Sequence, residues 1–250
     1  MLYDINESIS SFKKKFTEVQ EKEWIESYST KTSSVGIMFE HLLGKPVENL
    51  EWPDFDGIEI KTKCSTKNDF ITLFSAVPDN SFFETQRLRE QYGYPSKSNR
   101  QFKVFNISLF GNVPKSLSNK YRLELRVDYK LKKVVMNIFN KKSFTIRDRV
   151  SWSFELLEEK LLRKLHHLAY VKAEYKYEKG SLFFKYTNYQ MYKLKGLQEF
   201  LELIDQGKIR VTFRISVFMS GKRKGETHDH GTSFDLDEHY LEKLFKKIEQ

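Results

Sequence analysis

The most informative segment of this chain is Glu51-Trp52-Pro53-Asp54-Phe55-Asp56-Gly57-Ile58-Glu59-Ile60-Lys61-Thr62-Lys63. Asp54 directly follows a proline in a predicted turn, and a glycine then leads into a short strand of alternating apolar and charged residues. Because side chains on a strand point alternately to its two faces, Ile58 and Ile60 face one way and Glu59 and Lys61 the other. Glu59 and Lys61 are then about 7 Å apart along the polar face, within reach of Asp54.

Two carboxylates and an ammonium group at one place suit metal-assisted hydrolysis of a phosphodiester. Asp54 and Glu59 offer the oxygen ligands that a hard cation such as Mg²⁺ prefers. Lys61 can orient a water, help to deprotonate it, and neutralise charge on the phosphorane. The alternative is an ion pair on a solvated sheet face, and the spacing alone leaves both interpretations open.

The charge of the chain favours a polyanionic partner. Lys and Arg number 43 against 34 Asp and Glu, a formal net charge of +9. Such an excess attracts polyanions through steering and counterion release. A basic surface without a partner is the alternative, but the charges cluster, for example at Lys13–Lys15 and Lys222–Lys224, and aromatic residues make up 15% of the chain. This combination predicts contact with nucleic acid.

Length and cysteine content limit the number of domains, the possible metal sites and the cellular location. The 250 residues can bury one sizeable core or two apposed lobes. No apolar run approaches the roughly 20 residues that cross a bilayer, and the start of the chain lacks the features of a signal peptide. Cys64 is the only cysteine, which excludes an intrachain disulfide and a cysteine-rich zinc site. We therefore expect no membrane association and a reducing, cytoplasmic location.

Hydrophobic periodicity predicts a mixed α/β or α+β chain. Helices are expected over residues 8–27, 35–43, 82–92, 154–168, 194–205 and 238–248. Strands are expected over residues 58–63, 70–75, 102–110, 121–128, 134–139, 168–177, 182–187, 209–218 and 232–236. No linker marks a boundary, so the division into a catalytic part at 1–150 and a C-terminal part at 151–250 is a working interpretation, with one compact unit as the alternative.

Glu40 lies at the edge of the apolar stripe of the predicted helix 35–43, which Gly44 and Pro46 end. A carboxylate there is either a solvated flank residue or one directed at a neighbouring site. Without further context the solvated flank is the more common arrangement.

A second polar motif covers Ser220–Gly231 and contains a basic triplet followed by His228-Asp229-His230. It separates two predicted strands, so we expect a loop. In an extended chain the two histidines share one face and Asp229 the other. Three interpretations stay open: a His-x-His metal site, a solvated basic loop, and a loop that reads G·C pairs in the major groove through Arg, Lys, His and a carboxylate.

The order of these motifs resembles a known family. Gly36-x-x-x-Glu40 is followed by Pro53-Asp54-Phe55, by Gly57-Ile58-Glu59-Ile60-Lys61-Thr62, and much later by Ser220-Gly221-Lys222 through His228-Asp229-His230-Gly231. The pattern is similar to the MutH-like nucleases, which share the PD-(D/E)xK core. Within them it is similar to the MvaI/BcnI branch of type II restriction endonucleases, more to the MvaI side, and the similarity covers nearly the whole chain.

The resemblance implies a set of site residues. Asp54, Glu59 and Lys61 take the catalytic positions, with Glu40 beside them. Asp54, Glu59 and the Ile60 carbonyl would bind Mg²⁺; Mn²⁺ would substitute, and Ca²⁺ would bind without supporting cleavage. Contacts to DNA would come from Arg214, Lys222, Arg223, Lys224, His228, Asp229 and His230.

The resemblance also implies a fold and an activity. The fold would be restriction-endonuclease-like, with a central mixed sheet flanked by helices, a smaller C-terminal recognition lobe, and double-stranded DNA held between them. The enzyme would act as a monomer that nicks one strand at a time at a short CC-N-GG type site, leaving a 5′-phosphate and a 3′-hydroxyl. It would work in a bacterial cytoplasm beside a cognate DNA methyltransferase that it need not contact. The alternatives are a MutH-like nicking enzyme that needs a partner and a DNA-binding module without catalysis.

Overall fold

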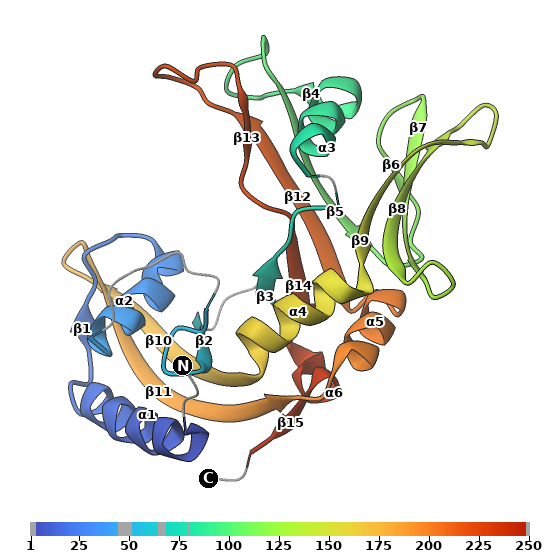
Figure 1. Ribbon diagram of the computed structural model, residues 1–250. Coiled ribbons are helices and arrows are strands. Elements are labelled where there is room, and N and C mark those ends of the chain that lie inside the picture. Colours follow the sequence, from blue (N-terminus) through green and yellow to red (C-terminus); the bar gives the residue numbers. More distant parts are fainter. Residues whose placement is uncertain (1–3, 45–51, 65–68, 80, 249–250) are drawn as a thin grey trace. The chain divides into compact units, whose positions relative to one another are not determined.

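The computed structural model describes residues 4–44, 52–64, 69–79 and 81–248 (Figure 1). The chain contains both helices and strands, with a run of consecutive strands from β4 to β9, as in the predicted α+β class. No helix in these ranges is long and apolar enough to cross a membrane. The α-helices are α1 (Ile5–Gln20), α2 (Val35–Leu42), α3 (Ser81–Arg87), α4 (Phe154–Leu165), α5 (Leu197–Asp205) and α6 (Leu241–Leu244).

The chain forms two compact units, each built from separate stretches of sequence. Unit 1 comprises Met1–Asp69, Leu161–Lys195 and Phe245–Gln250, and unit 2 comprises Phe70–Lys160 and Gly196–Leu244. This division differs from the working boundary at residue 150, because the chain leaves unit 1 and returns to it twice. Unit 2, which contains the motif at Ser220–Gly231, is the larger of the two rather than a smaller C-terminal lobe.

Unit 1 contains a mixed sheet, as expected, with the strand order β1-β11-β10-β2 and with β15 added beside β11. Strands β2 and β10 pair in parallel, whereas β10 and β11 form a long antiparallel hairpin. The hairpin turns at Lys179 and Gly180, both at positive φ, which suits the expected turn. The strands are β1 (Ile25–Glu26), β2 (Ile58–Cys64), β10 (His167–Glu178), β11 (Ser181–Leu194) and β15 (Phe245–Lys247).

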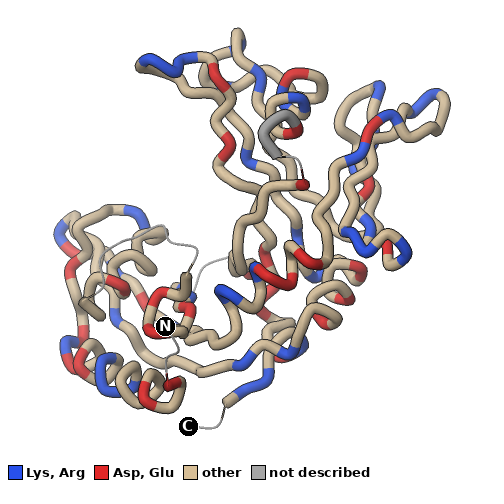
Figure 2. Tube along the Cα trace, in the orientation of Figure 1, with Lys and Arg blue, Asp and Glu red and all other residues tan. Residues whose placement is uncertain are grey.

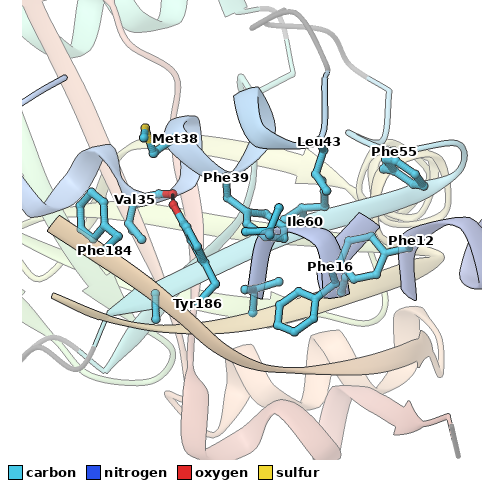
Figure 3. Close-up of a cluster of buried hydrophobic side chains, with 14 of the residues drawn as sticks. Phe12, Phe16, Val35, Met38, Phe39, Leu43, Phe55, Ile60, Phe184 and Tyr186 are labelled. Atoms are coloured by element: carbon cyan, nitrogen blue, oxygen red, sulfur yellow. Dashed lines mark hydrogen bonds between the residues drawn. The ribbon is translucent and has the colours of Figure 1, made fainter. Parts of the chain in front are cut away.

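The core of unit 1 lies between this sheet and the helices α1 and α2 (Figure 3). Phe12 of α1 is fully buried and meets Phe39 of α2 at 6.3 Å between ring centroids. The hydroxyl of the buried Tyr186 donates to the Val35 carbonyl over 3.0 Å, which ties α2 to the sheet. Burying each such aromatic side chain stabilises the unit by about 2–3 kcal/mol. The packing fixes α2, and with it Glu40, against β2.

Unit 2 contains two sheets. One has the order β3-β14-β12-β5-β4 with β13 beside β12, and the other is the meander β6-β7-β8-β9. Trp152 is fully buried against Phe213 and Phe234, and its indole N–H donates to the Ala76 carbonyl over 3.1 Å. The strands are β3 (Phe70–Ser75), β4 (Tyr94–Pro95), β5 (Lys103–Phe110), β6 (Lys115–Ser116), β7 (Tyr121–Asp128), β8 (Lys133–Asn140), β9 (Ile146–Ser153), β12 (Ile209–Val217), β13 (Thr227–Asp229) and β14 (Ser233–Asp237).

Several predicted helices are too long at their C-terminal ends, most of all those expected over 8–27 and 238–248. Helix α1 ends at Gln20 instead of residue 27, because Ile25 and Glu26 pair with β11. The helix expected over 238–248 is a 3₁₀ turn followed by α6, and β15 then pairs with β11. In both places the backbone hydrogen bonds of the sheet take over from local helix propensity.

Other differences concern strands. Strands β9 and β13 were not predicted. Strand β9 is rich in charged residues, and β13 is only three residues long. Helix α4 ends at Leu165 rather than residue 168, because β10 begins at His167. Ser153 caps its N-terminal end: the Leu156 N–H donates to Ser153 Oγ over 3.3 Å.

Candidate active site and DNA-reading loop

A tight turn at Asp56 and Gly57 brings Asp54 back toward β2. Phe55 and Ile58 exchange backbone hydrogen bonds of 2.9 and 2.7 Å, and the two residues between them have φ of 43° and 86°. Positive φ at both central positions is the geometry that an Asp-Gly pair favours in a two-residue hairpin. As a result, Asp54 Oδ2 accepts a hydrogen bond from the Ile60 N–H over 2.9 Å.

Strand β2 separates apolar from charged side chains as predicted. Ile58 and Ile60 belong to the core of unit 1. On the other face Lys61 Nζ lies 2.5 Å from Glu59 Oε1. Glu59 is only 1% exposed, so this face is not the solvated surface of the alternative interpretation. Its second oxygen, Oε2, is buried and has no hydrogen-bond partner among the described residues.

Burial acts on both members of this pair, but it decides the direction of the pKa shift only for Glu59. It raises the pKa of Glu59 to about 7; the Lys61 ammonium opposes the rise and the Asp54 carboxylate adds to it. Burial alone would lower the pKa of Lys61, but the carboxylates of Glu59, Asp54 and Glu40 outweigh it and raise that pKa. Lys61 is therefore held as an ammonium ion. It is suited to orienting groups and to compensating charge rather than to removing a proton.

Glu40 on α2 belongs to the same cluster. Burial and the neighbouring Asp54 carboxylate raise its pKa, while Lys61 and Lys164 lower it. The side chain is only half-buried, yet all three of these charged groups act on it. The Glu40 carboxyl is therefore near enough to these groups for their charges to affect its pKa, and its place in the active site stays a prediction.

Lys164 is a member of the cluster that the sequence analysis missed. It lies in the last turn of α4, and its Nζ is 3.5 Å from Glu59 Oε1. Local sequence contains no sign of this, because a lysine near the end of a helix is ordinary. Only the parallel pairing of β10 with β2, which sets Leu168 opposite Glu59, places the end of α4 there.

The residues present fit a hard divalent cation. The donors are carboxylate oxygens, and Glu59 Oε2 is a buried acceptor without a partner in the described structure. No three His, Cys, Asp or Glu side chains within the described ranges are grouped so as to hold a metal ion. A cation would therefore need further oxygens, such as the Ile60 carbonyl, water or phosphate.

The second motif, in unit 2, is partly a strand. Thr227–Asp229 form β13 and pair with the end of β12, and the loop between them carries Lys and Arg residues at its tip (Figure 2). The rings of Phe218 and His228 stack with 4.1 Å between their centroids and an interplanar angle of 13°. The Arg223 guanidinium lies over the same Phe218 ring, 4.1 Å from its centroid. His230 follows at 4.0 Å from His228, so the two histidines lie together as predicted.

Two predicted DNA contacts also organise this loop. Arg214 on β12 donates to the carbonyls of His230 and Gly231 and to Ser75 Oγ. Asp229 Oδ1 accepts from the Gly231 N–H over 2.8 Å, and burial raises the pKa of this carboxyl. Both residues therefore shape the backbone that presents the histidines.

The remaining predicted contacts fall into two groups. Lys222, Arg223 and Lys224 are exposed, and Arg223 pairs with Glu226. His230 Nε2 lies 2.9 Å from Ser216 Oγ, which orients its ring. The described residues place no metal-binding group of three around the two histidines.

Comparison with known proteins decides the family. A model of the MvaI/BcnI restriction endonuclease family matches residues 13–245, nearly the whole chain. The chain belongs to this family. It is therefore a type II site-specific deoxyribonuclease, and the predicted relationship is confirmed.

Solved structures of the restriction endonuclease MvaI are similar to this chain over nearly its whole length. One, described as a restriction endonuclease MvaI-cognate DNA substrate complex, has a TM-score of 0.86 and 31% identity, covering 97% of this chain and 98% of the other. Another, MvaI in the absence of DNA, has a TM-score of 0.61 and 30% identity, covering 97% of each chain. Comparison with curated proteins gives no significant match. These matches confirm the restriction-endonuclease-like fold and leave the individual roles of the site residues as predictions.

Proposed function

We propose that this MvaI/BcnI enzyme is a Mg²⁺-dependent endonuclease that binds double-stranded DNA and cuts it at a short CC-N-GG type site, leaving 5′-phosphate ends. The observation that carries the proposal is the convergence of Asp54, Glu59, Glu40 and Lys61 at the start of β2. We also propose that it acts as a cytoplasmic monomer, nicking the strands in sequence, with a methyltransferase protecting the host DNA.

The proposed division of labour follows from the chemistry of the groups. Asp54, Glu59 and the Ile60 carbonyl would hold the divalent cation, which supplies Lewis-acid stabilisation of charge that develops on phosphate oxygens. Lys61 remains protonated and would donate hydrogen bonds to the attacking water and to the phosphate. Glu40 would act beside Asp54, through water, since its pKa is sensitive to Asp54. Such interactions act most strongly on the transition state, where negative charge grows.

Recognition is proposed for the loop that β12 and β13 carry. Its stack of Arg223, Phe218, His228 and His230 holds planar groups in fixed orientations, which limits the entropy lost on binding. Histidine and arginine donors suit the acceptor edge of guanine, and a carboxylate suits the amino group of cytosine. The exposed Lys222 and Lys224 would contact phosphates.

The test is cleavage of a supercoiled plasmid that contains varied CC-N-GG sequences. With Mg²⁺ we expect discrete fragments that form through a nicked circle, and with Ca²⁺ binding without cleavage. Sequencing the fragment ends gives the recognition site and the cut position. Asp54→Asn should bind DNA in Ca²⁺ and not cut it, since an amide oxygen can still accept from Ile60 while the charge is lost. Glu21→Gln, at an exposed position, is the control and should cut normally.

Four results would contradict the proposal. Random nicking in place of discrete fragments would exclude a site-specific cut, and full activity of Asp54→Asn would remove that residue from the site. A permanently nicked product that needs a second protein for the other strand would favour the MutH-like alternative. A dimer on the cognate site, measured by analytical ultracentrifugation, would refute the monomer.

The loop is tested at Asp229 with two substitutions. Asp229→Ala removes both the carboxylate and the acceptor for the Gly231 N–H, whereas Asp229→Asn keeps an acceptor of the same shape. If the carboxylate reads a base, both variants should lose discrimination by about 1–3 kcal/mol, measured as relative kcat/KM on cognate and single-mismatch duplexes. If only the alanine variant loses it, Asp229 acts by shaping the loop and the base contact lies elsewhere.

A further inference from the structure

Lys164 stands beside a carboxylate that already has a lysine partner. Its Nζ is 3.5 Å from Glu59 Oε1, the same oxygen that Lys61 contacts at 2.5 Å. Lys164 reaches this oxygen from α4, a different element from β2. Its side chain is 25% exposed, whereas that of Glu59 is 1% exposed. The buried carboxylate thus faces two ammonium groups on one oxygen.

The proposed function requires one of these groups to leave. Lys61 cannot turn its ammonium toward a water or a phosphate while it stays 2.5 Å from Glu59. Before the divalent cation binds, and if Glu59 had no other cationic neighbour, releasing Lys61 would leave a buried carboxylate without a counter-charge, which is strongly unfavourable. A second ammonium that stays in place lowers this cost.

We propose that Lys164 is a positioning residue that compensates the charge of Glu59 and so frees Lys61 for the reacting groups. The inference rests on the proposed function, because it assigns Lys61 to the water and phosphate. Both ammonium groups lie near Oε1, which leaves Oε2, an oxygen without a hydrogen-bond partner among the described residues, as the ligand for a cation. In this arrangement Lys164 contacts neither DNA nor the reacting atoms.

The first test compares single-turnover cleavage at saturating Mg²⁺ and DNA. Lys164→Met should lower the rate constant about 10–100-fold, the usual effect of removing a group that supports a metal ligand. Lys164→Arg, which keeps the charge, should stay within about threefold of the parent protein. DNA affinity in Ca²⁺, and its dependence on salt, should be unchanged in both variants. Lys172→Met, at an exposed position on β10, is the matched control.

The second test does not depend on activity. In EDTA, Lys164→Met leaves Glu59 with Lys61 alone, so a cation has more charge to compensate. The rise in Tm on adding Ca²⁺ or Mg²⁺ should then be several degrees larger for Lys164→Met than for the parent protein or for Lys172→Met. If Lys164 only packs the end of α4, the variant loses the same stability with and without the cation.

The outcomes separate this inference from the proposed function. A parent protein that does not cut DNA refutes the proposed function, while the Tm comparison still tests the Lys164–Glu59 contact. If the parent cuts and Lys164→Met cuts equally well, only the inference fails. It also fails if the rate drops but the cation dependence of Tm is unchanged, or if the salt dependence of DNA binding weakens, since Lys164 would then act on DNA.

Discussion

Two buried glutamates in this protein, Glu124 and Glu59, differ in how their carboxylate oxygens are paired. Glu124 on β7 of unit 2 is 5% exposed, and Glu59 on β2 of unit 1 is 1% exposed. Glu124 gives each oxygen its own partner, with Oε1 at 2.8 Å from Arg122 and Oε2 at 2.8 Å from Arg126. In Glu59, by contrast, Lys61 and Lys164 both lie near Oε1, and Oε2 has no hydrogen-bond partner among the described residues.

This difference distinguishes a structural carboxylate from one that is suited to catalysis. A buried carboxylate with both oxygens bound to guanidinium groups stabilises and stiffens its sheet. A buried carboxylate with an open oxygen and a raised pKa sits at a cost to stability, which proteins tolerate mainly at functional sites. Glu59 fits the second description and Glu124 the first. The predictions below test this contrast in order of expected effect.

Glu59→Gln should have the largest effect, and on activity rather than on folding. The amide keeps the shape but removes the charge that faces the cation and Lys61. We expect cleavage to fall at least about 1000-fold, or roughly 4 kcal/mol in the barrier. Because a costly buried charge is lost, the Tm in EDTA should stay equal or rise. Steady-state cleavage and thermal unfolding measure the two parts, and a large fall in Tm would show that Glu59 is structural like Glu124.

The pH dependence of stability should distinguish the same residue. The pKa of Glu59 is about 7 in the folded protein and near its ordinary 4.5 in the unfolded chain. The folded state therefore holds this proton more tightly, and the stability that it contributes falls as pH rises from 4.5 to 7. The loss is at most about 3 kcal/mol. Urea unfolding in EDTA at pH 5 and pH 8 should show a larger loss for the parent protein than for Glu59→Gln; equal losses would contradict the raised pKa.

Glu124→Ala should destabilise the protein without affecting the chemistry. It leaves Arg122 and Arg126 facing each other without the carboxylate between them. Breaking a fully buried pair costs about 3–5 kcal/mol, and partial exposure of the two arginines reduces this to about 2 kcal/mol. Urea unfolding measures the loss, and the rate of cleavage per folded molecule should be retained. If the rate falls as far as in Glu59→Gln, the contrast between the two glutamates does not hold.

Arg126→Gln should have the smallest effect. The arginine side chain is 59% exposed, and Glu124 keeps its bond to Arg122. Removing an exposed partner costs about 0.5 kcal/mol. A midpoint shift in urea with unchanged slope measures it. A loss above that of Glu124→Ala would mean that Arg126 supports more of the sheet than its exposure indicates.

Local sequence is sufficient for some of the site. The Asp-Gly turn and the alternation in β2 separate Ile58 and Ile60 from Glu59 and Lys61, since both depend only on neighbouring residues. The same holds for the cap of α4 at Ser153. The ends of helices were harder to predict where the next residues form a short strand that pairs with a distant one. This happens at β1 and β15, which both pair with β11.

The amino-acid sequence alone is enough to predict the strand face that carries Glu59 and Lys61, the turn before it, and the family, because these lie in short contiguous motifs. The three-dimensional fold is needed to show that this face is buried, that Glu40 lies within the electrostatic influence of Asp54 and Lys61, and that Lys164 contacts Glu59. Those features depend on the parallel pairing of β2 with β10, whose residues lie more than 100 positions apart, and on the packing of α2 against β2. Burial, and with it the raised pKa of Glu59, comes from contacts that no local pattern specifies.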